Sequence, residues 1–249
     1  MLQACLNGAR DRGECGTLPV TPQELAAQAQ RAVAAGAEDV HLHPKDADGR
    51  DSLEPGLVGE AVMAVRAAVP KSVQVGVTTG AWAVPDPQRR ADLIRSWVIL
   101  PDHASVNWHE HGAEAVASVL LDLGIGIEAG IYSGTDAARR FLASPLSARV
   151  LRVLAEVTDT DPRTAVTTAA SLVKELSDGL AAPVLLHGED GGAWPVLEAA
   201  ARLGLDTRIG LEDVLVLPDG ATAGDNAALI DAARKFLDSQ GGQHLWVGR

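Results

Sequence analysis

Short apolar segments alternate along the chain with longer segments in which apolar residues recur every three or four positions. The short segments are rich in Val, Ile and Leu, which is typical of buried strands, and the longer ones have the period of amphipathic helices. Thr21 is a favourable N-cap for the first helix, and Gly36 is a favourable residue just after its end. The expected strands cover residues 2–6, 39–43, 73–77, 103–108, 124–131, 149–156, 183–187 and 207–210, and the expected helices cover residues 22–35, 55–69, 87–98, 113–123, 135–143, 162–180, 193–203 and 222–240.

These strand–helix units favour one closed architecture. Apolar strands joined by helices pair in parallel through right-handed crossovers, and eight such units in about 250 residues are the usual content of a (β/α)8 barrel. A doubly wound open sheet is the competing fold, but it requires a glycine-rich phosphate motif after the first strand, where residues 7–16 read NGARDRGECG. We therefore predict an α/β fold, a (β/α)8 TIM barrel forming a single domain over residues 1–249. Residues 241–249 would be a short C-terminal tail that packs on a neighbouring subunit.

Composition narrows the class of protein. The chain has 33 acidic and 21 basic residues, a formal net charge of −12, and 3% aromatic residues, which argues against a general nucleic-acid binder. Cys5 and Cys15 are too few for a disulfide framework, and the longest apolar runs are too short to cross a bilayer. The first residues do not have the pattern of a signal peptide. We expect a cytoplasmic protein without nucleic-acid or membrane partners.

Two histidines end the second expected strand in the pattern His-x-His. Because side chains alternate along a strand, His41 and His43 point to the same side, where two neutral imidazoles make half of a zinc site. Strands two and eight both flank strand one in a barrel, so Glu212 after strand eight can approach as a third ligand. Asp213 is then a second carboxylate beside the metal and a candidate base. The alternatives are two histidines with separate hydrogen bonds and an acidic turn that favours a helix dipole.

Arg208 lies four residues before Glu212 and has the same side-chain parity on the eighth strand. A guanidinium inside a barrel needs an anionic partner. That partner is Asp213, Glu128 or a carboxylate of the substrate, and the sequence leaves the choice open.

Uncharged polar side chains also lie near the ends of strands. Thr78 and Thr79 end the third strand, and Ser105 and Asn107 lie with equal parity on the fourth. In a barrel the carboxyl ends of the strands carry the functional side chains, so we expect these four to bind substrate oxygens. Their residue types are equally common in strands and turns that have no such function.

A second His-x-His pattern, formed by His109 and His111 around Glu110, is a rival ligand set in an expected loop. The loop after the seventh strand, residues 187–192, reads HGEDGG. Its glycines suit backbone binding of a phosphate, but its two carboxylates would repel one. Whether His187 or His109 joins the metal site is left open.

Several segments together resemble the β-keto acid cleavage enzymes, a family typified by 3-keto-5-aminohexanoate cleavage enzyme. The resemblance covers nearly the whole chain in order. It is carried by NGAR (7–10), the stretch from LPVTPQELA to VHLHPKDADGRDSL (18–53), VTTGAW (77–82), ASVNW (104–108) and RIGLEDVL (208–215).

The resemblance implies a (β/α)8 barrel, usually assembled as a homotetramer, with Zn2+ at the carboxyl ends of the strands. It implies that a β-keto acid and acetyl-CoA are converted into acetoacetate and a new acyl-CoA. His41, His43 and Glu212 match the zinc ligands of the family, and Asp213 and Arg208 match its catalytic aspartate and the arginine that supports it. By the same resemblance Thr78 and Ser105 fall at substrate-binding positions. In the mechanism that the resemblance implies, zinc polarises the keto carbonyl, Asp213 removes an α-proton, the enolate attacks the thioester, CoA migrates, and a retro-Claisen step splits the product.

Arg10 departs from the family pattern, because the prototype carries a glutamate there that binds an amino group. A cation at this position favours a substrate with a second acidic or a neutral polar group, so we expect Arg10 to bind substrate and to disfavour an aminated one.

Two other functions compete with this interpretation. Barrel hydrolases of the amidohydrolase kind also use His-x-His, but they place it on the first strand and add histidines from the fifth and sixth strands. In this chain none of these three expected strands contains a histidine. A catalytically silent barrel that binds a small acid is the other alternative. Formation of acetoacetate that depends on acetyl-CoA separates the three, because the hydrolase needs only water and the silent barrel shows no turnover.

Overall fold

The predicted alternation of strands and helices is confirmed in the computed structural model, which describes residues 1–177 and 180–241. The strands are β1 (Leu2–Cys5), β2 (Asp39–Leu42), β3 (Gln74–Thr78), β4 (His103–Asn107), β5 (Gly126–Tyr132), β6 (Arg152–Val157), β7 (Val184–Gly188) and β8 (Thr207–Ile209). The helices are α1 (Pro22–Ala34), α2 (Pro55–Ala68), α3 (Pro87–Arg95), α4 (Ala113–Asp122), α5 (Ala137–Ala143), α6 (Ala165–Ser177), α7 (Ala193–Leu203) and α8 (Asn226–Gly241).

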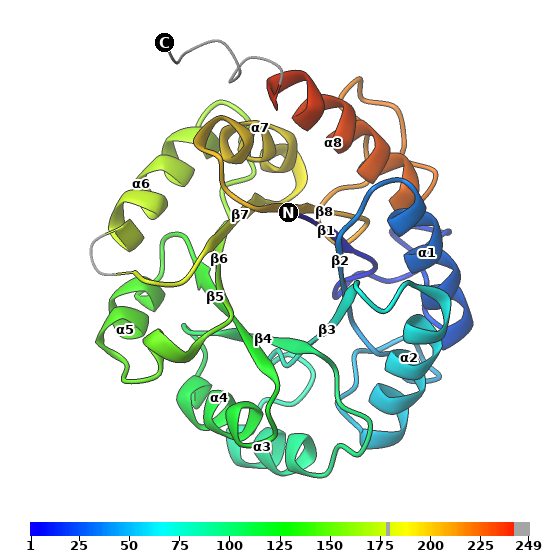
Figure 1. Ribbon diagram of the computed structural model, residues 1–249, viewed down its shortest axis with the longest axis vertical. Coiled ribbons are helices and arrows are strands. Elements are labelled where there is room, and N and C mark those ends of the chain that lie inside the picture. The colour runs from blue at the N-terminus through cyan, green and yellow to red at the C-terminus, as the bar shows by residue number, and fades with distance from the viewer. Residues whose placement is uncertain (178–179, 242–249) are drawn as a thin grey trace.

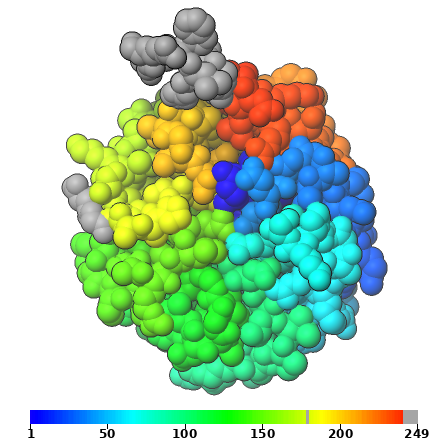
Figure 2. All heavy atoms as spheres, viewed as in Figure 1, coloured from blue at the N-terminus to red at the C-terminus, as the bar shows by residue number. Residues whose placement is uncertain are grey.

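The strands form one parallel sheet in the order β7-β6-β5-β4-β3-β2-β1-β8, curved into a ring with the helices outside (Figure 1). Between β8 and β7 the ring closes through one parallel bridge, from Leu185 to Asp206. The predicted TIM barrel is thereby confirmed as a nearly closed one. Figure 2 shows atoms filling the centre of the ring on the face toward the viewer, so the barrel is packed there. The predicted packing of the C-terminal tail concerns residues 242–249, which lie outside the described residues.

Local chemistry explains where the first helix begins and ends. Thr21 caps α1 by accepting from the backbone N–H of Glu24, whose carboxylate accepts in return from the N–H of Thr21. Gly36 follows the helix with φ +114°, a conformation that residues with a Cβ rarely adopt.

Helix α6 is shorter than predicted. Strand β6 starts three residues later than predicted because residues 147–149 form a short 3-10 helix. No helix within the described ranges combines the length and the apolar character needed to span a bilayer.

A buried ionic layer crosses the barrel interior below the strand ends. His103 on β4 lies 3.0 Å from Asp39 and 3.2 Å from Glu128, measured from its two ring nitrogens. Arg152 on β6 bridges the same two carboxylates at 2.6 Å and 3.0 Å. The ring of His103 fits because Gly76 faces it, where a Cβ would lie 2.0 Å from the imidazole. Opposite charges are therefore balanced inside the barrel.

We predict that unfolding depends on pH through His103. Burial disfavours the imidazolium, but Glu128 and Asp39 outweigh it and raise the pKa of His103 to about 10. The stabilisation from its charged form is full below the unfolded pKa of about 6.5 and is lost as pH rises through 10. Urea unfolding at pH 7, 8.5 and 10 should show a falling free energy of unfolding, and His103→Gln should flatten that decline. An equally steep decline in the variant would assign it to other groups.

Candidate metal centre and its pocket

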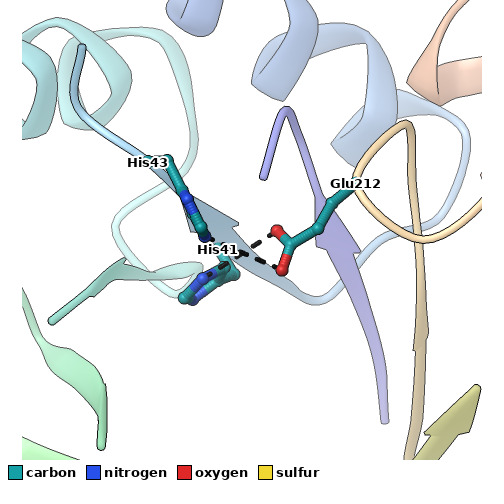
Figure 3. A group of neighbouring side chains, drawn as sticks. All are labelled: His41, His43 and Glu212. Carbon is teal, nitrogen blue, oxygen red and sulfur yellow. Dashed lines mark ion pairs between the residues drawn. The ribbon is translucent and has the colours of Figure 1, made fainter. Parts of the chain in front are cut away.

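Three side chains from different parts of the chain meet at the carboxyl ends of the strands (Figure 3). His41 lies on β2 and His43 just beyond it, and both imidazoles are buried. Glu212 follows β8, and β1 lies between β2 and β8. The His41 Nε2 atom is 3.9 Å from one oxygen of Glu212, and the His43 Nε2 atom is 3.7 Å from the other. Gly8 permits this approach, since a Cβ there would lie 2.5 Å from the Glu212 side chain.

The donor atoms suit a divalent metal ion. One ligand atom from each residue lies within 4.8 Å of the others, and a tetrahedral zinc site with bonds of about 2.0 Å needs separations of about 3.3 Å. Within the described part of the chain, no hydrogen-bond partner reaches the buried Oε2 atom of Glu212. Burial lowers the pKa of His41 to about 4, so its imidazole is in the neutral form that binds metals. Burial opposes ionisation of Glu212, but Arg208 and the histidines lower its pKa to about 2.

A neighbouring carboxylate holds the imidazole of His43 in place. His43 Nδ1 lies 2.7 Å from Asp51, which leaves Nε2 facing Glu212. Asp51 also accepts from Lys45 at 2.6 Å and from the Trp82 indole at 2.7 Å, and that indole stacks on the His43 ring. A carboxylate behind a ligating histidine orients the ring and increases its basicity.

We predict that Asp51→Asn lowers metal affinity about 10–100-fold, because the amide orients His43 more weakly and adds no negative charge. Competition with a chromophoric chelator measures the change. Asp48→Asn, an exposed aspartate of the same loop, is the matched control. Equal affinities for the two variants would contradict a supporting role for Asp51.

Arg208 links the metal-binding carboxylate to a second one. Its guanidinium donates to Glu212 and to Asp213, both at 2.9 Å, and its Nε donates to His187 at 3.2 Å. Of the anionic partners that the sequence left open for Arg208, the structure shows Asp213, and it adds Glu212. The other carboxylate oxygen of Asp213 is buried and accepts no hydrogen bond from any residue in the described ranges. A buried carboxylate with one free oxygen can accept a proton from a ligand beside the metal site.

A pocket of about 410 Å³ opens beside these residues. Tyr132, Glu156 and His187 lie within one residue of the carboxyl ends of β5, β6 and β7, and they form the wall away from β2. The lining residues are Ala9, Arg10, Glu14, His43, Trp82, Tyr132, Glu156, Val157, Thr158, His187, Glu189, Asp190, Arg208, Glu212 and Asp213.

Arg10 lines the pocket, and two carboxylates already hold it. Its guanidinium donates to Glu14 at 3.0 Å and to Asp190 at 2.6 Å, and its Nε donates to the backbone oxygen of Glu212 at 3.1 Å. A substrate group at this position would share the guanidinium with those carboxylates.

The four uncharged residues predicted to bind substrate do not line this pocket. Thr78 and Asn107 end β3 and β4, Thr79 follows β3, and Ser105 lies in the middle of β4. Thr79 donates its hydroxyl proton to the backbone oxygen of Ser105 at 2.6 Å, and Thr78 accepts from the N–H of Gly80 at 3.1 Å. The Asn107 amide donates to Glu110 at 3.0 Å. Their role toward substrate stays a prediction.

The rival pattern of His109, Glu110 and His111 does not bring three ligand atoms together in the part of the chain that the structure describes. Among the described residues, His41, His43 and Glu212 are the one set of three whose ligand atoms gather within 4.8 Å. Glu110 is instead buried against Arg90 at 2.9 Å, and the ring of His109 packs on Tyr132.

Sequence reasoning missed several residues of the site. Glu156 and Tyr132 end the sixth and fifth strands, so the rule that selected His41 also applied to them. Asp51 lies in a loop, where position relative to a strand carries no signal, and its contact with His43 required the structure.

Comparison with known proteins identifies the family and the fold of the chain. The model of the family BKACE, beta-keto acid cleavage enzyme, matches residues 1–245. The structure of ObcA in ternary complex with a C4-CoA adduct and oxalate superimposes with a TM-score of 0.74 at 16% identity, over 90% of this chain and 64% of that one. The chain thus spans somewhat less than two thirds of that relative.

Another barrel superimposes less closely. Type I 3-dehydroquinate dehydratase from Clostridium difficile gives a TM-score of 0.65 at 10% identity, over 99% of this chain and 93% of that one. At these identities the two structures show the shared fold alone. The family match over nearly the full length goes further: the chain belongs to the β-keto acid cleavage enzyme family.

Proposed function

We propose that this protein is a zinc-dependent enzyme that converts a β-keto acid and acetyl-CoA into acetoacetate and a new acyl-CoA. The observation that carries the proposal is the meeting of His41, His43 and Glu212 beside the buried Asp213, in a chain that belongs to this family. The ObcA complex with a C4-CoA adduct supports a CoA ester as the second reactant.

A divalent metal ion, when bound, would act as a Lewis acid toward the carbonyl of the keto acid. Asp213 would take the α-proton on its free carboxylate oxygen and return it at the end of the reaction. Arg208 holds the other oxygen of Asp213, so it fixes the direction of the free one. Because Arg208 also holds Glu212, it sets the spacing between the base and the metal ligands.

The test is a screen of β-keto acids with the zinc-loaded protein, with and without acetyl-CoA, that measures acetoacetate. We expect acetoacetate with at least one keto acid, in equal amount to the new acyl-CoA, and none without acetyl-CoA. Turnover that needs only water would favour a hydrolase, and the absence of turnover across the screen would favour a silent barrel.

We predict that a dicarboxylic β-keto acid is used in preference to an aminated one of equal length. Glu14 and Asp190 offset the charge of Arg10 only in part, because both are half exposed, so an ammonium group beside this guanidinium would still be repelled, whereas a second carboxylate could share it. A competition assay with both substrates in one mixture measures the ratio of their kcat/KM values. A clear preference for the aminated acid would contradict the role of Arg10.

We further propose that residues 1–249 act as one domain in a cytoplasmic homotetramer, as the family resemblance implies. Light scattering during size-exclusion chromatography measures the subunit count, and a monomeric mass would contradict a tetramer.

A further inference from the structure

One buried nitrogen in the pocket wall has no partner among the residues that the structure describes. His187 is 4% exposed and lines the pocket, and its Nε2 atom makes no hydrogen bond there. Native proteins rarely leave a buried polar atom unpaired, and such an atom calls for an explanation such as a ligand.

The neighbours of His187 determine which nitrogen carries its proton. Arg208 Nε can only donate, and it donates to His187 Nδ1 at 3.2 Å, whereas Asp213 lies farther from that atom at 3.5 Å. Burial and the Arg208 charge lower the pKa of His187, so the ring is neutral. Nδ1 is therefore the acceptor, and Nε2 bears an N–H that is free to donate.

The strand register places two more polar side chains at the same level as His187. Tyr132 on β5 is the register partner of Glu156 on β6, and Glu156 is the register partner of His187 on β7. The nearest carboxylate oxygen of Glu156 is 3.7 Å from His187 Nε2, too far for a hydrogen bond. Gly130 leaves room for this carboxyl, because a Cβ there would lie 2.9 Å from it. We call Tyr132, Glu156 and His187 the β5–β7 row.

Burial raises the pKa of Glu156 to about 8. Arg208 lowers it, but the negative charges of Glu212 and Asp213 oppose Arg208. The carboxyl of Glu156 is then mainly protonated at neutral pH and can donate rather than accept. Two donors that face each other would not bond, which agrees with the gap between Glu156 and His187. An oxygen that lies to one side of these two atoms can accept from both, because hydrogen bonds of about 2.8 Å from atoms 3.7 Å apart can meet at one point.

We propose that the β5–β7 row is a second oxygen-binding site, which holds the thioester carbonyl oxygen of the acyl-CoA across the barrel from His41 and His43. The inference rests on the proposed function. When the carbanion attacks the thioester carbon, a C–C bond forms and the carbonyl π electrons move onto this oxygen. They return to the carbonyl when the C–S bond breaks and CoA leaves as the thiolate, which becomes the thiol of the new acyl-CoA. Neutral donors that are already in position stabilise such a charge, and a neutral carboxylic acid is able to serve in this way. Figure 1 shows β6 across the ring from β2, so Glu156 on β6 lies on the wall opposite the strand that carries His41.

Substitutions at Glu156 separate a neutral donor from a carboxylate. Glu156→Leu removes the donor, so kcat should fall about 10²–10³-fold. Glu156→Gln supplies an amide N–H, so kcat should fall less than about tenfold. Both variants should keep stoichiometric zinc. A loss as large for Gln as for Leu would show that Glu156 acts as a carboxylate and would overturn the proposal.

Infrared spectra of bound acetyl-CoA, labelled with ¹³C at the thioester carbonyl, give a readout that is independent of turnover. The carbonyl band should move to lower frequency on the wild-type protein and on Glu156→Gln, and it should shift less on Glu156→Leu and His187→Phe. His111→Phe, an exposed histidine outside the pocket, is the matched control and should resemble the wild type. Turnover with a carbonyl band that is the same in wild type and His187→Phe overturns this inference alone. No acetyl-CoA-dependent turnover in the wild type overturns the proposed function with it.

Discussion

Asp213→Asn should keep its zinc and lower kcat about 10²–10⁴-fold, because an amide cannot take the α-proton. The substitution is nearly isosteric, and Arg208 can still donate to the amide oxygen, so the metal ligands should keep their positions. Steady-state formation of acetoacetate measures the loss, and metal analysis of the same sample measures the zinc.

Asp238→Asn, an exposed aspartate on α8, is the control for the amide substitution and should have wild-type kcat. Unchanged turnover in Asp213→Asn would place the base elsewhere. Loss of zinc in that variant would instead show that Asp213 mainly supports the metal ligands.

His41→Ala should abolish stoichiometric zinc binding and, with it, activity. It removes one of three protein ligands from a site whose atoms lie within 4.8 Å, and the two that remain cannot form the three-ligand set typical of catalytic zinc. Dialysis against zinc followed by elemental analysis should give about one zinc per chain for the wild type and far less for the variant.

His111→Ala is the matched control, since this exposed histidine belongs to the rival His-x-His pattern. It should keep one zinc per chain. Retention of zinc in His41→Ala would refute the assignment of the ligands.

Much of the barrel follows from local sequence signals. The capping box at Thr21 and the glycine after α1 mark both ends of that helix. Boundaries failed where short-range contacts compete with the apolar period, as at residues 147–149, where a 3-10 helix delays β6. Closure of the ring by a single bridge at Leu185 depends on contacts between distant segments, which a periodicity does not contain.

The candidate site was predictable as far as strand order determines neighbours. Because β1 separates β2 from β8, the sequence placed Glu212 near His41, and the structure brings them to 3.9 Å. The hydrogen-bond partners of individual side chains were not predictable. Arg10 looked like a free cation, yet two carboxylates hold it, and Thr79 is bonded to a neighbouring strand. The β5–β7 row depends on the register between strands, which no single segment encodes.

The most direct test of the metal centre is anomalous diffraction at the zinc edge from crystals grown with zinc. We expect a peak about 2.0–2.2 Å from His41 Nε2, His43 Nε2 and a Glu212 oxygen. A zinc peak bound elsewhere, with these three side chains bound only to protein or water, would contradict this expectation.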